Sequence, residues 1–247
     1  YMDFDKLKQD SRTSLHKAVI DEPAYYKSVG KLRNFSFWSP PKNGLWEHQQ
    51  IAICTAIAYI HGEKKIPGRQ GVTEAALLKL PTATGKSGII AVIARCLDAV
   101  QRVLILTPRI ALTDQLMDDV TATFWTRVGY SHVPDGADTV LQHKNGDRID
   151  NASIRKILPS NAATLTQDNK QHAKKRMVLV GTHQALAEIR RSMEGDDKAK
   201  RSEAEKFLSA VKSSFDIVIV DEGHYEPAVS WSRGVREFNL PTILLSA

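Results

Sequence analysis

Short apolar runs alternate with helical patterns along most of this chain, and this alternation is the feature that most limits how it can fold. Runs rich in Val, Ile and Leu and bounded by turn residues are typical of strands buried on both faces of a sheet. Such runs span residues 75–80, 103–107, 177–181, 217–220 and 242–245. Helical patterns lie between them, for example over residues 88–100 and 110–125. The chain is therefore predicted to have an α/β fold, with a mostly parallel sheet covered by helices on both faces.

Length and composition favour one large soluble domain. The chain has 247 residues, of which 42% are hydrophobic and 25% charged, and no apolar run approaches the roughly 20 residues that cross a bilayer. The sequence contains no pattern typical of a secretory signal. Cys54 and Cys96 both lie in apolar patterns typical of buried thiols, so a cytoplasmic location is expected. A net charge of +6 permits attraction to nucleic-acid phosphates without establishing it.

Three segments fit the strand and helix alternation less well. Residues 1–44 are mixed and mostly polar and end in a turn, so we expect an N-terminal appendage before a domain spanning 45–247. Residues 128–176 contain two turn signals, which predict an insertion with a short strand or hairpin. The charge run at 194–201 is typical of a solvated helix or loop, and this interpretation is favoured over a binding tail.

The strongest local signal lies between the first predicted strand and an apolar helix. This loop consists of Pro81, Thr82, Ala83, Thr84, Gly85, Lys86 and Ser87. Backbone N–H groups at a helix N-terminus cradle phosphates, Lys86 would neutralise their charge, and Ser87 offers a hydroxyl to magnesium. Leu80 stands where the first glycine of such loops is found, and Ala83 occupies a position that is often glycine. An ordinary turn is the alternative, but the strand, loop and helix context favours nucleotide binding.

A pair of carboxylates follows another predicted strand. Asp221 and Glu222 come directly after residues 217–220, which would hold both side chains at the carboxyl edge of the sheet, beside the phosphate loop. Nucleotide hydrolysis needs one acidic group for magnesium and another to polarise the attacking water. Asp221 and Glu222 would serve in that order. Two adjacent acids can also cap a helix, but the phosphate loop upstream favours the catalytic interpretation.

Six segments, in order along the chain, resemble motifs of the superfamily 2 helicases and translocases. They are residues 45–50 (Leu-Trp-Glu-His-Gln-Gln), 81–87, 107–109 (Thr-Pro-Arg), 180–186, 221–224 (Asp-Glu-Gly-His) and 245–247. Residues 221–224 resemble the DExH form of motif II, and residues 81–87 resemble motif I. The DExH box, together with the Thr-x-Gln segment at 182–184, is most similar to the restriction-enzyme-like or DNA-repair-like branch.

The resemblance implies a RecA-like P-loop NTPase domain that binds ATP with Mg²⁺. Residues 81–87 would hold the phosphates, with Ser87 and Asp221 as the protein ligands of the metal. Gln49 would hydrogen-bond adenine, although Trp46 and Glu47 depart from the Arg-Pro often seen beside this glutamine. The catalytic group implied by the motifs consists of Lys86, Asp221, Glu222 and His224.

The resemblance also implies a nucleic-acid partner and a second domain. Arg109 and Thr182 would contact backbone phosphates, and His224 would couple the nucleotide site to motif III at Ser246. In such motors a second RecA-like domain supplies an arginine finger, and its loss costs about a thousandfold or more in rate. We expect this second domain beyond Ala247, so that residues 1–247 alone would bind nucleotide but hydrolyse it poorly.

Several alternatives remain open at this stage. RNA remodelling competes with DNA translocation, and an ATP-binding regulatory module or a small-molecule kinase is less favoured. Phe37 or Trp38 could stack on the base, but core packing is the favoured use of both. The basic residues at 174–176 could extend a nucleic-acid track, although a solvated turn is preferred.

Overall fold

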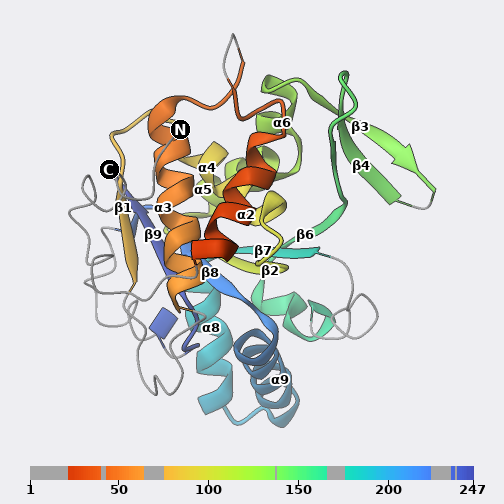
Figure 1. Ribbon diagram of the computed structural model, residues 1–247. Helices are drawn as coiled ribbons and strands as arrows, with labels where there is room; N and C mark the ends of the chain where they lie inside the picture. Colours follow the sequence, from red (N-terminus) through yellow and green to blue (C-terminus); the bar gives the residue numbers. More distant parts are fainter. Residues whose placement is uncertain are drawn as a thin grey trace.

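A computed structural model of the chain describes residues 22–39, 43–63, 75–136, 138–165, 176–223, 235–236 and 238–247. At its centre is a six-stranded sheet in the order β1-β9-β8-β2-β7-β6, with every neighbouring pair parallel (Figure 1). Its strands are β1 (Ala76–Lys79), β2 (Arg102–Thr107), β6 (Ala152–Lys156), β7 (Arg176–Thr182), β8 (Ile217–Val220) and β9 (Thr242–Ser246). The predicted α/β fold with a parallel sheet is confirmed, and its strand order is that of a RecA-like domain, in which β9 separates the phosphate-loop strand β1 from β8.

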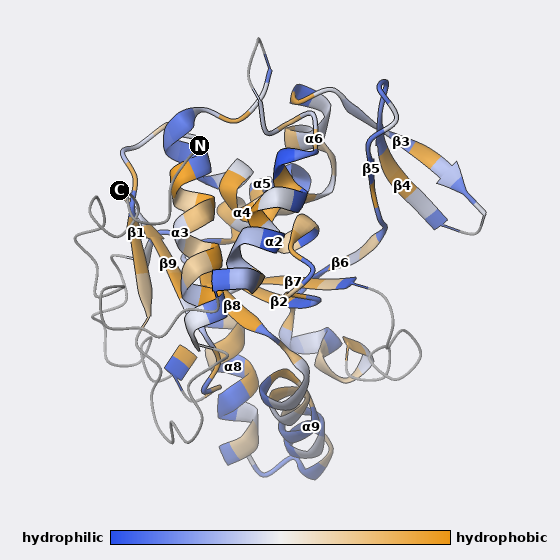
Figure 2. Cartoon of the chain, in the orientation of Figure 1, coloured by the Kyte–Doolittle hydropathy of each residue, from blue (hydrophilic) through white to orange (hydrophobic). Residues whose placement is uncertain are grey.

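Helices cover both faces of this sheet. The helical segments are α2 (Glu22–Arg33), α3 (Glu47–Glu63), α4 (Lys86–Cys96), α5 (Ile110–Asp118), the π-helical η2 (Asp119–Thr123), α6 (Phe124–Arg127), the 3₁₀ turn η3 (Pro159–Asn161), α8 (His183–Glu194) and α9 (Lys198–Ser214). Side chains of β2 alternate between the two cores: Val103 and Ile105 pack with α2, α3 and α4, whereas Leu104 and Leu106 pack with α8 and α9. In Figure 2, apolar colouring follows the strands and also marks α3 and α4, which pack against one face of the sheet. In the described part of the chain, no helix is both long and apolar enough to cross a membrane.

The insertion predicted at residues 128–176 divides into two parts. Strands β3 (Tyr130–Asp135), β4 (Asp138–His143) and β5 (Arg148–Ile149) form a small antiparallel sheet, which contains the predicted hairpin. Strand β6 instead joins the central sheet beside β7. Its sequence does not form an apolar run, because an edge strand pairs on one side only and each of its residues stays partly exposed.

The N-terminal residues that the structure describes pack into the main domain. Tyr25, Val29 and Leu32 of α2 are buried in the same core as α3 and α4. Phe37 and Trp38 are also buried, 0% and 5% exposed, so their predicted use in core packing is confirmed. The boundary proposed at residue 44 stays a prediction, but residues 22–39 are packed against the domain that follows.

Candidate nucleotide site

Most of the predicted site residues lie at one edge of the central sheet. Because all six strands are parallel, their carboxyl ends point the same way. The phosphate loop follows β1, Arg109 follows β2, Thr182 ends β7, Asp221 follows β8 and Ser246 ends β9. In Figure 1 these strand ends are neighbours in space although they are far apart in sequence. Ligands of α/β proteins bind at this edge.

The loop between β1 and α4 is shaped to receive an anion. Gly85 has φ +75° and caps α4 without a side-chain hydrogen bond, so the first N–H groups of the helix lack an intrahelical acceptor. A Cβ on Gly85 would lie 2.3 Å from the Gln49 Nε2 and would have to displace that side chain, and the left-handed φ would strain any residue other than glycine. Ala83 also adopts a left-handed φ, +64°, which explains why glycine is often found at this position. Leu80 instead extends the strand, and its N–H donates to the Ser246 carbonyl at 2.8 Å.

Exposure differs along the loop. Pro81, Thr82 and Ala83 are exposed, whereas Lys86 and Ser87 at the start of α4 are partly buried. The Thr84 hydroxyl donates to the Pro81 carbonyl at 2.7 Å, which closes the turn. The loop therefore presents backbone at its tip and its two functional side chains, Lys86 and Ser87, at its base.

Lys86 and Glu222 form an ion pair across the site. The Lys86 Nζ lies 2.9 Å from Glu222 Oε1, with side chains only 11% and 26% exposed. Asp221 is held beside them, because its N–H donates to the Leu106 carbonyl of β2 at 2.9 Å. Glu222 has φ +55°, a left-handed conformation that turns the chain immediately after β8. The predicted phosphate-binding lysine and the predicted carboxylate pair are thus brought together from positions 136 residues apart.

The start of α3 holds the loop from the side. Gln49 is 9% exposed, and its Nε2 donates to the carbonyls of Thr84 at 3.0 Å and Gly85 at 3.3 Å. The Gln49 Oε1 accepts from the Trp46 N–H at 2.9 Å. His48 Nε2 also lies 3.0 Å from the Thr84 carbonyl. Adenine recognition by Gln49 stays a prediction; what the structure gives this side chain is a tether to the phosphate loop.

Sequence reasoning missed Trp46 and His48 as site residues. The Trp46 ring is 60% exposed and meets the His48 ring edge-on at 5.4 Å between centroids. Both belong to the segment that tethers the phosphate loop, so they border the site. Their signal was their spacing from Gln49, because Trp46 lies three residues before it and His48 one residue before it.

Three of the remaining predicted residues, Arg109, Thr182 and Ser246, lie at other strand ends along the same edge of the sheet. Arg109 is exposed before α5, and Thr182 is 8% exposed, its hydroxyl oxygen accepting from the Ala185 N–H at 3.0 Å as the cap of α8. Ser246 is buried at the end of β9, beside Lys79 of β1. His224 lies outside the described residues, so its predicted coupling to Ser246 stays a prediction.

The arrangement fits a magnesium nucleotide. The uncapped N-terminus of α4 and the glycine cradle suit phosphate oxygens, and the Ser87 hydroxyl with the Asp221 carboxylate are hard oxygen donors that suit Mg²⁺. Among the described residues there is no cluster of three or more His, Cys, Asp or Glu able to hold a metal ion. A site with two protein ligands is consistent with that, because Mg²⁺ keeps waters and substrate phosphates in its coordination shell.

Residues 43–247 match the model of the family described as type III restriction enzyme, res subunit. The chain belongs to this family. No curated protein matches it at a significant level. The res-subunit match and the RecA-like sheet together show a superfamily 2 helicase-like ATP-binding domain. Within this res-subunit family member, the match covers the phosphate loop, the carboxylate pair and the tethering segment of α3.

Proposed function

We propose that this domain is the ATP-binding motor domain of a DNA helicase or translocase, which couples ATP hydrolysis to movement on DNA when joined to a second RecA-like domain. The observation that carries the proposal is the Lys86–Glu222 ion pair, because it joins the phosphate-binding loop to the carboxylates that hydrolysis needs. The family description, a restriction enzyme subunit, favours DNA over RNA.

The residues divide the work of hydrolysis among them. Lys86 and the N–H groups at the start of α4 bind phosphate oxygens, and Ser87 and Asp221 hold the metal. Mg²⁺ neutralises charge on the transferred phosphate when it is bound. When phosphate binds Lys86, it displaces the Glu222 carboxylate from the ammonium. The released Glu222 then orients and deprotonates the attacking water. Arg109 and Thr182 are the proposed contacts to nucleic-acid phosphates, at the β2 and β7 end of the same edge.

Calorimetric titration with Mg-ATP tests the nucleotide site. We expect saturable binding by the wild-type chain and its loss in Lys86→Ala, because Lys86 supplies the positive charge of the phosphate loop. Lys144→Ala, at an exposed turn of the small sheet, is the matched control and should bind as the wild type does. Equal affinity of Lys86→Ala and the wild type would contradict the proposal.

A further inference from the structure

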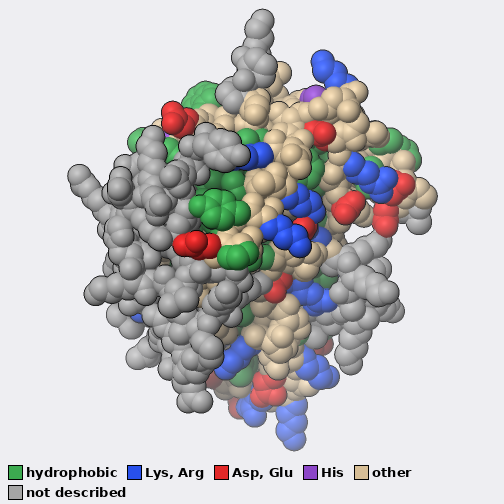
Figure 3. Space-filling model, viewed as in Figure 1, with side chains coloured by type: hydrophobic (Ala, Val, Ile, Leu, Met, Phe, Trp, Pro, Cys, Tyr) green, Lys and Arg blue, Asp and Glu red, His purple; other side chains and the backbone are tan. Residues whose placement is uncertain are grey.

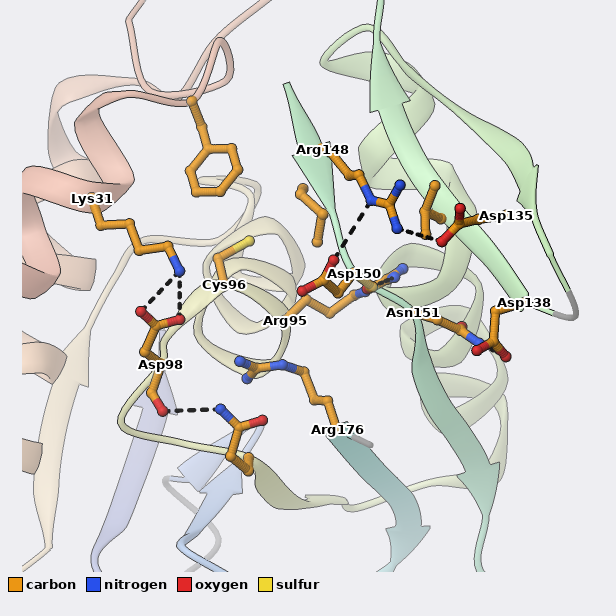
Figure 4. A pocket seen from close by; sticks show the side chains of 14 residues that line it. Lys31, Arg95, Cys96, Asp98, Asp135, Asp138, Arg148, Asp150, Asn151 and Arg176 are labelled. Atoms are coloured by element: carbon orange, nitrogen blue, oxygen red, sulfur yellow. Dashed lines mark hydrogen bonds and ion pairs between the residues drawn. The ribbon is translucent and has the colours of Figure 1, made fainter. Parts of the chain in front are cut away.

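A second polar cavity lies at the opposite edge of the central sheet. Its volume is about 340 Å³, and its lining includes Arg176 at the start of β7 and Gln101 just before β2. The amino ends of the parallel strands form this edge, so the cavity is separated from the nucleotide site by the length of the strands. The end of α4 and the small sheet of β3, β4 and β5 complete its walls (Figure 4).

Arg95 contributes a buried guanidinium to this cavity. Arg95 is 5% exposed, and its Nη2 donates to the Asp150 carbonyl at 3.0 Å. Its Nη1 reaches the Val120 and Thr121 carbonyls only at 3.5 and 3.4 Å. Its Nε is buried and finds no acceptor among the described residues. An unmet buried donor on a cation is costly. The guanidinium also lies over the Trp125 ring, with its Cζ 5.7 Å from the ring centroid, but this contact supplies no acceptor for Nε.

Arg176 brings a second guanidinium to the same cavity. It donates to the carbonyls of Ala94, at 3.1 Å, and of Leu97, at 2.9 Å, and also to the Val100 carbonyl. These bonds cap the C-terminal end of α4, where a cation is favourable. Capping accounts for the position of Arg176, but it supplies no negative charge to balance either arginine.

The carboxylates that line the cavity are engaged elsewhere. Asp98 pairs with Lys31 at 2.6 Å, and Arg148 pairs with Asp135 and, at 3.7 Å, with Asp150. Figure 4 shows Arg95 and Arg176 between these two groups, in the middle of the lining. Among the described residues, neither of the two central guanidiniums has an ion-pair partner. The cavity therefore has a cationic centre and an acidic rim.

Burial makes this positive charge unfavourable. Desolvation lowers the pKa of Arg95 to about 10, with a smaller contribution from the nearby charge of Arg176. Desolvation also lowers the pKa of Arg176. Both groups remain protonated at neutral pH, so a bound anion would relieve the cost of two buried like charges.

We propose that this cavity is a binding site for a small phosphate, as the free ion or as a monoester, held between Arg95 and Arg176. Guanidinium groups donate two N–H bonds to a phosphate in a fixed geometry, and phosphate supplies the negative charge with which neither Arg95 nor Arg176 is paired among the described residues. A polyanion such as a nucleic-acid backbone is disfavoured, because the acidic rim formed by Asp135, Asp138 and Asp150 would repel its further charges.

Titration of the Lys86→Ala chain with inorganic phosphate and with ribose 5-phosphate tests the proposal, because this background removes the contribution of the nucleotide site. We expect saturable binding of at least one of the two ligands at or below about 1 mM. Tighter binding of ribose 5-phosphate identifies a monoester site, whereas tighter binding of inorganic phosphate identifies a site for the free ion. No saturation of either ligand overturns the proposal.

Two further substitutions locate the site. Arg95→Lys keeps the positive charge but loses the planar guanidinium that donates two parallel N–H bonds. It should therefore weaken phosphate binding at least tenfold, which corresponds to about 1.4 kcal/mol. Asp150→Asn removes an exposed rim charge and should tighten binding two- to fivefold, about 0.4 to 1 kcal/mol. Mg-ATP binding by the single Arg95→Lys variant checks that it folds. Binding that is unchanged by Arg95→Lys in a folded chain would place the phosphate elsewhere and reject the site.

Discussion

At the scale of single residues, the site is set by a few side chains and backbone angles that the fold brings into contact. Lys86 is already neutralised by Glu222 before any nucleotide binds. In the proposed site, phosphate must therefore displace a carboxylate from the ammonium, so Lys86→Ala should abolish nucleotide binding whereas Glu222→Gln should retain it.

Glu222→Gln is expected to retain Mg-ATP binding, with affinity equal to the wild type or up to about tenfold tighter, because Lys86 no longer pairs with a carboxylate. In a protein that also carries the proposed second RecA-like domain, the same substitution should lower turnover by about 10²- to 10⁴-fold, since it removes the proposed general base. Calorimetry and phosphate release measure the two effects. Glu203→Gln, on the exposed surface of α9, is the control. Loss of nucleotide binding in Glu222→Gln would show that the carboxylate supports the site rather than competing for it.

Trp46 is expected to form a stacking surface for the adenine base. Its ring is 60% exposed beside the helix start that tethers the phosphate loop. Because base–aromatic stacking contributes about 1–3 kcal/mol, Trp46→Ala should weaken Mg-ATP binding about tenfold. Inorganic triphosphate, which has no base, should bind both chains equally, and Trp46→Phe should restore most of the affinity for ATP. An equal loss for ATP and triphosphate would mean that Trp46 supports the loop instead.

At the scale of elements, the small antiparallel sheet is fastened to the N-terminal segment through one carboxylate. Asp147 Oδ2 accepts from the Ser36 N–H at 2.5 Å, the Ser36 hydroxyl at 2.6 Å and the Tyr130 hydroxyl at 3.2 Å. Burial acts to raise the pKa of Asp147, but these hydrogen bonds and one from Asn145 outweigh it, so the pKa lies below its ordinary value of 3.8. The ionised form is therefore the one that joins the two segments.

Asp147→Asn is expected to lower the free energy of unfolding at neutral pH. Since the folded pKa is depressed, the contribution of Asp147 is fully present well above pH 3.8 and is lost as the pH falls through the folded value. The difference between wild type and Asp147→Asn should thus shrink below about pH 4. Urea unfolding across this range measures it, with Asp118→Asn, exposed on α5, as the control. A difference that is independent of pH would contradict the role of the ionised carboxylate.

At the scale of the whole molecule, two hydrophobic cores sandwich a parallel sheet whose opposite edges carry different sites. The candidate nucleotide site lies at the carboxyl edge, and the arginine-lined cavity lies at the amino edge. On the face drawn in Figure 3, basic and acidic side chains are intermixed over α8 and α9. The net charge of +6 is thus not gathered into a single patch on that face.

The 247-residue chain is expected to bind Mg-ATP but to turn it over about a thousandfold or more slowly than a protein that also has the second RecA-like domain, which supplies an arginine finger. Phosphate release by both proteins, with duplex DNA, single-stranded DNA or RNA added, measures this difference. Stimulation of the two-domain protein by DNA and not by RNA would support the DNA motor. Efficient nucleic-acid-stimulated turnover by the monomeric 247-residue chain would refute the expectation.

Elements whose signals are local can be predicted from the amino-acid sequence. Buried parallel strands such as β2 and β8 need apolar residues on both faces, so they can be recognised in the sequence as continuous apolar runs. The phosphate loop and the Asp221-Glu222 pair follow such strands directly, and parallel pairing then requires that they meet at one edge. This is why the fold, and the meeting of Lys86 with Glu222 at one edge of the sheet, could be predicted without coordinates.

Features that depend on partners distant in the chain are visible only in the folded protein. Strand β6 has mixed polarity, and it forms a strand because its backbone pairs with β7 in the central sheet. The Gln49 tether, the burial of α2 and the placement of Arg95 and Arg176 in one cavity depend on contacts between separate elements. The hydrogen-bond partners and the burial of a side chain depend on which residues lie next to it in space. Neither the hydrophobic periodicity nor the spacing of motifs in the sequence gives this information.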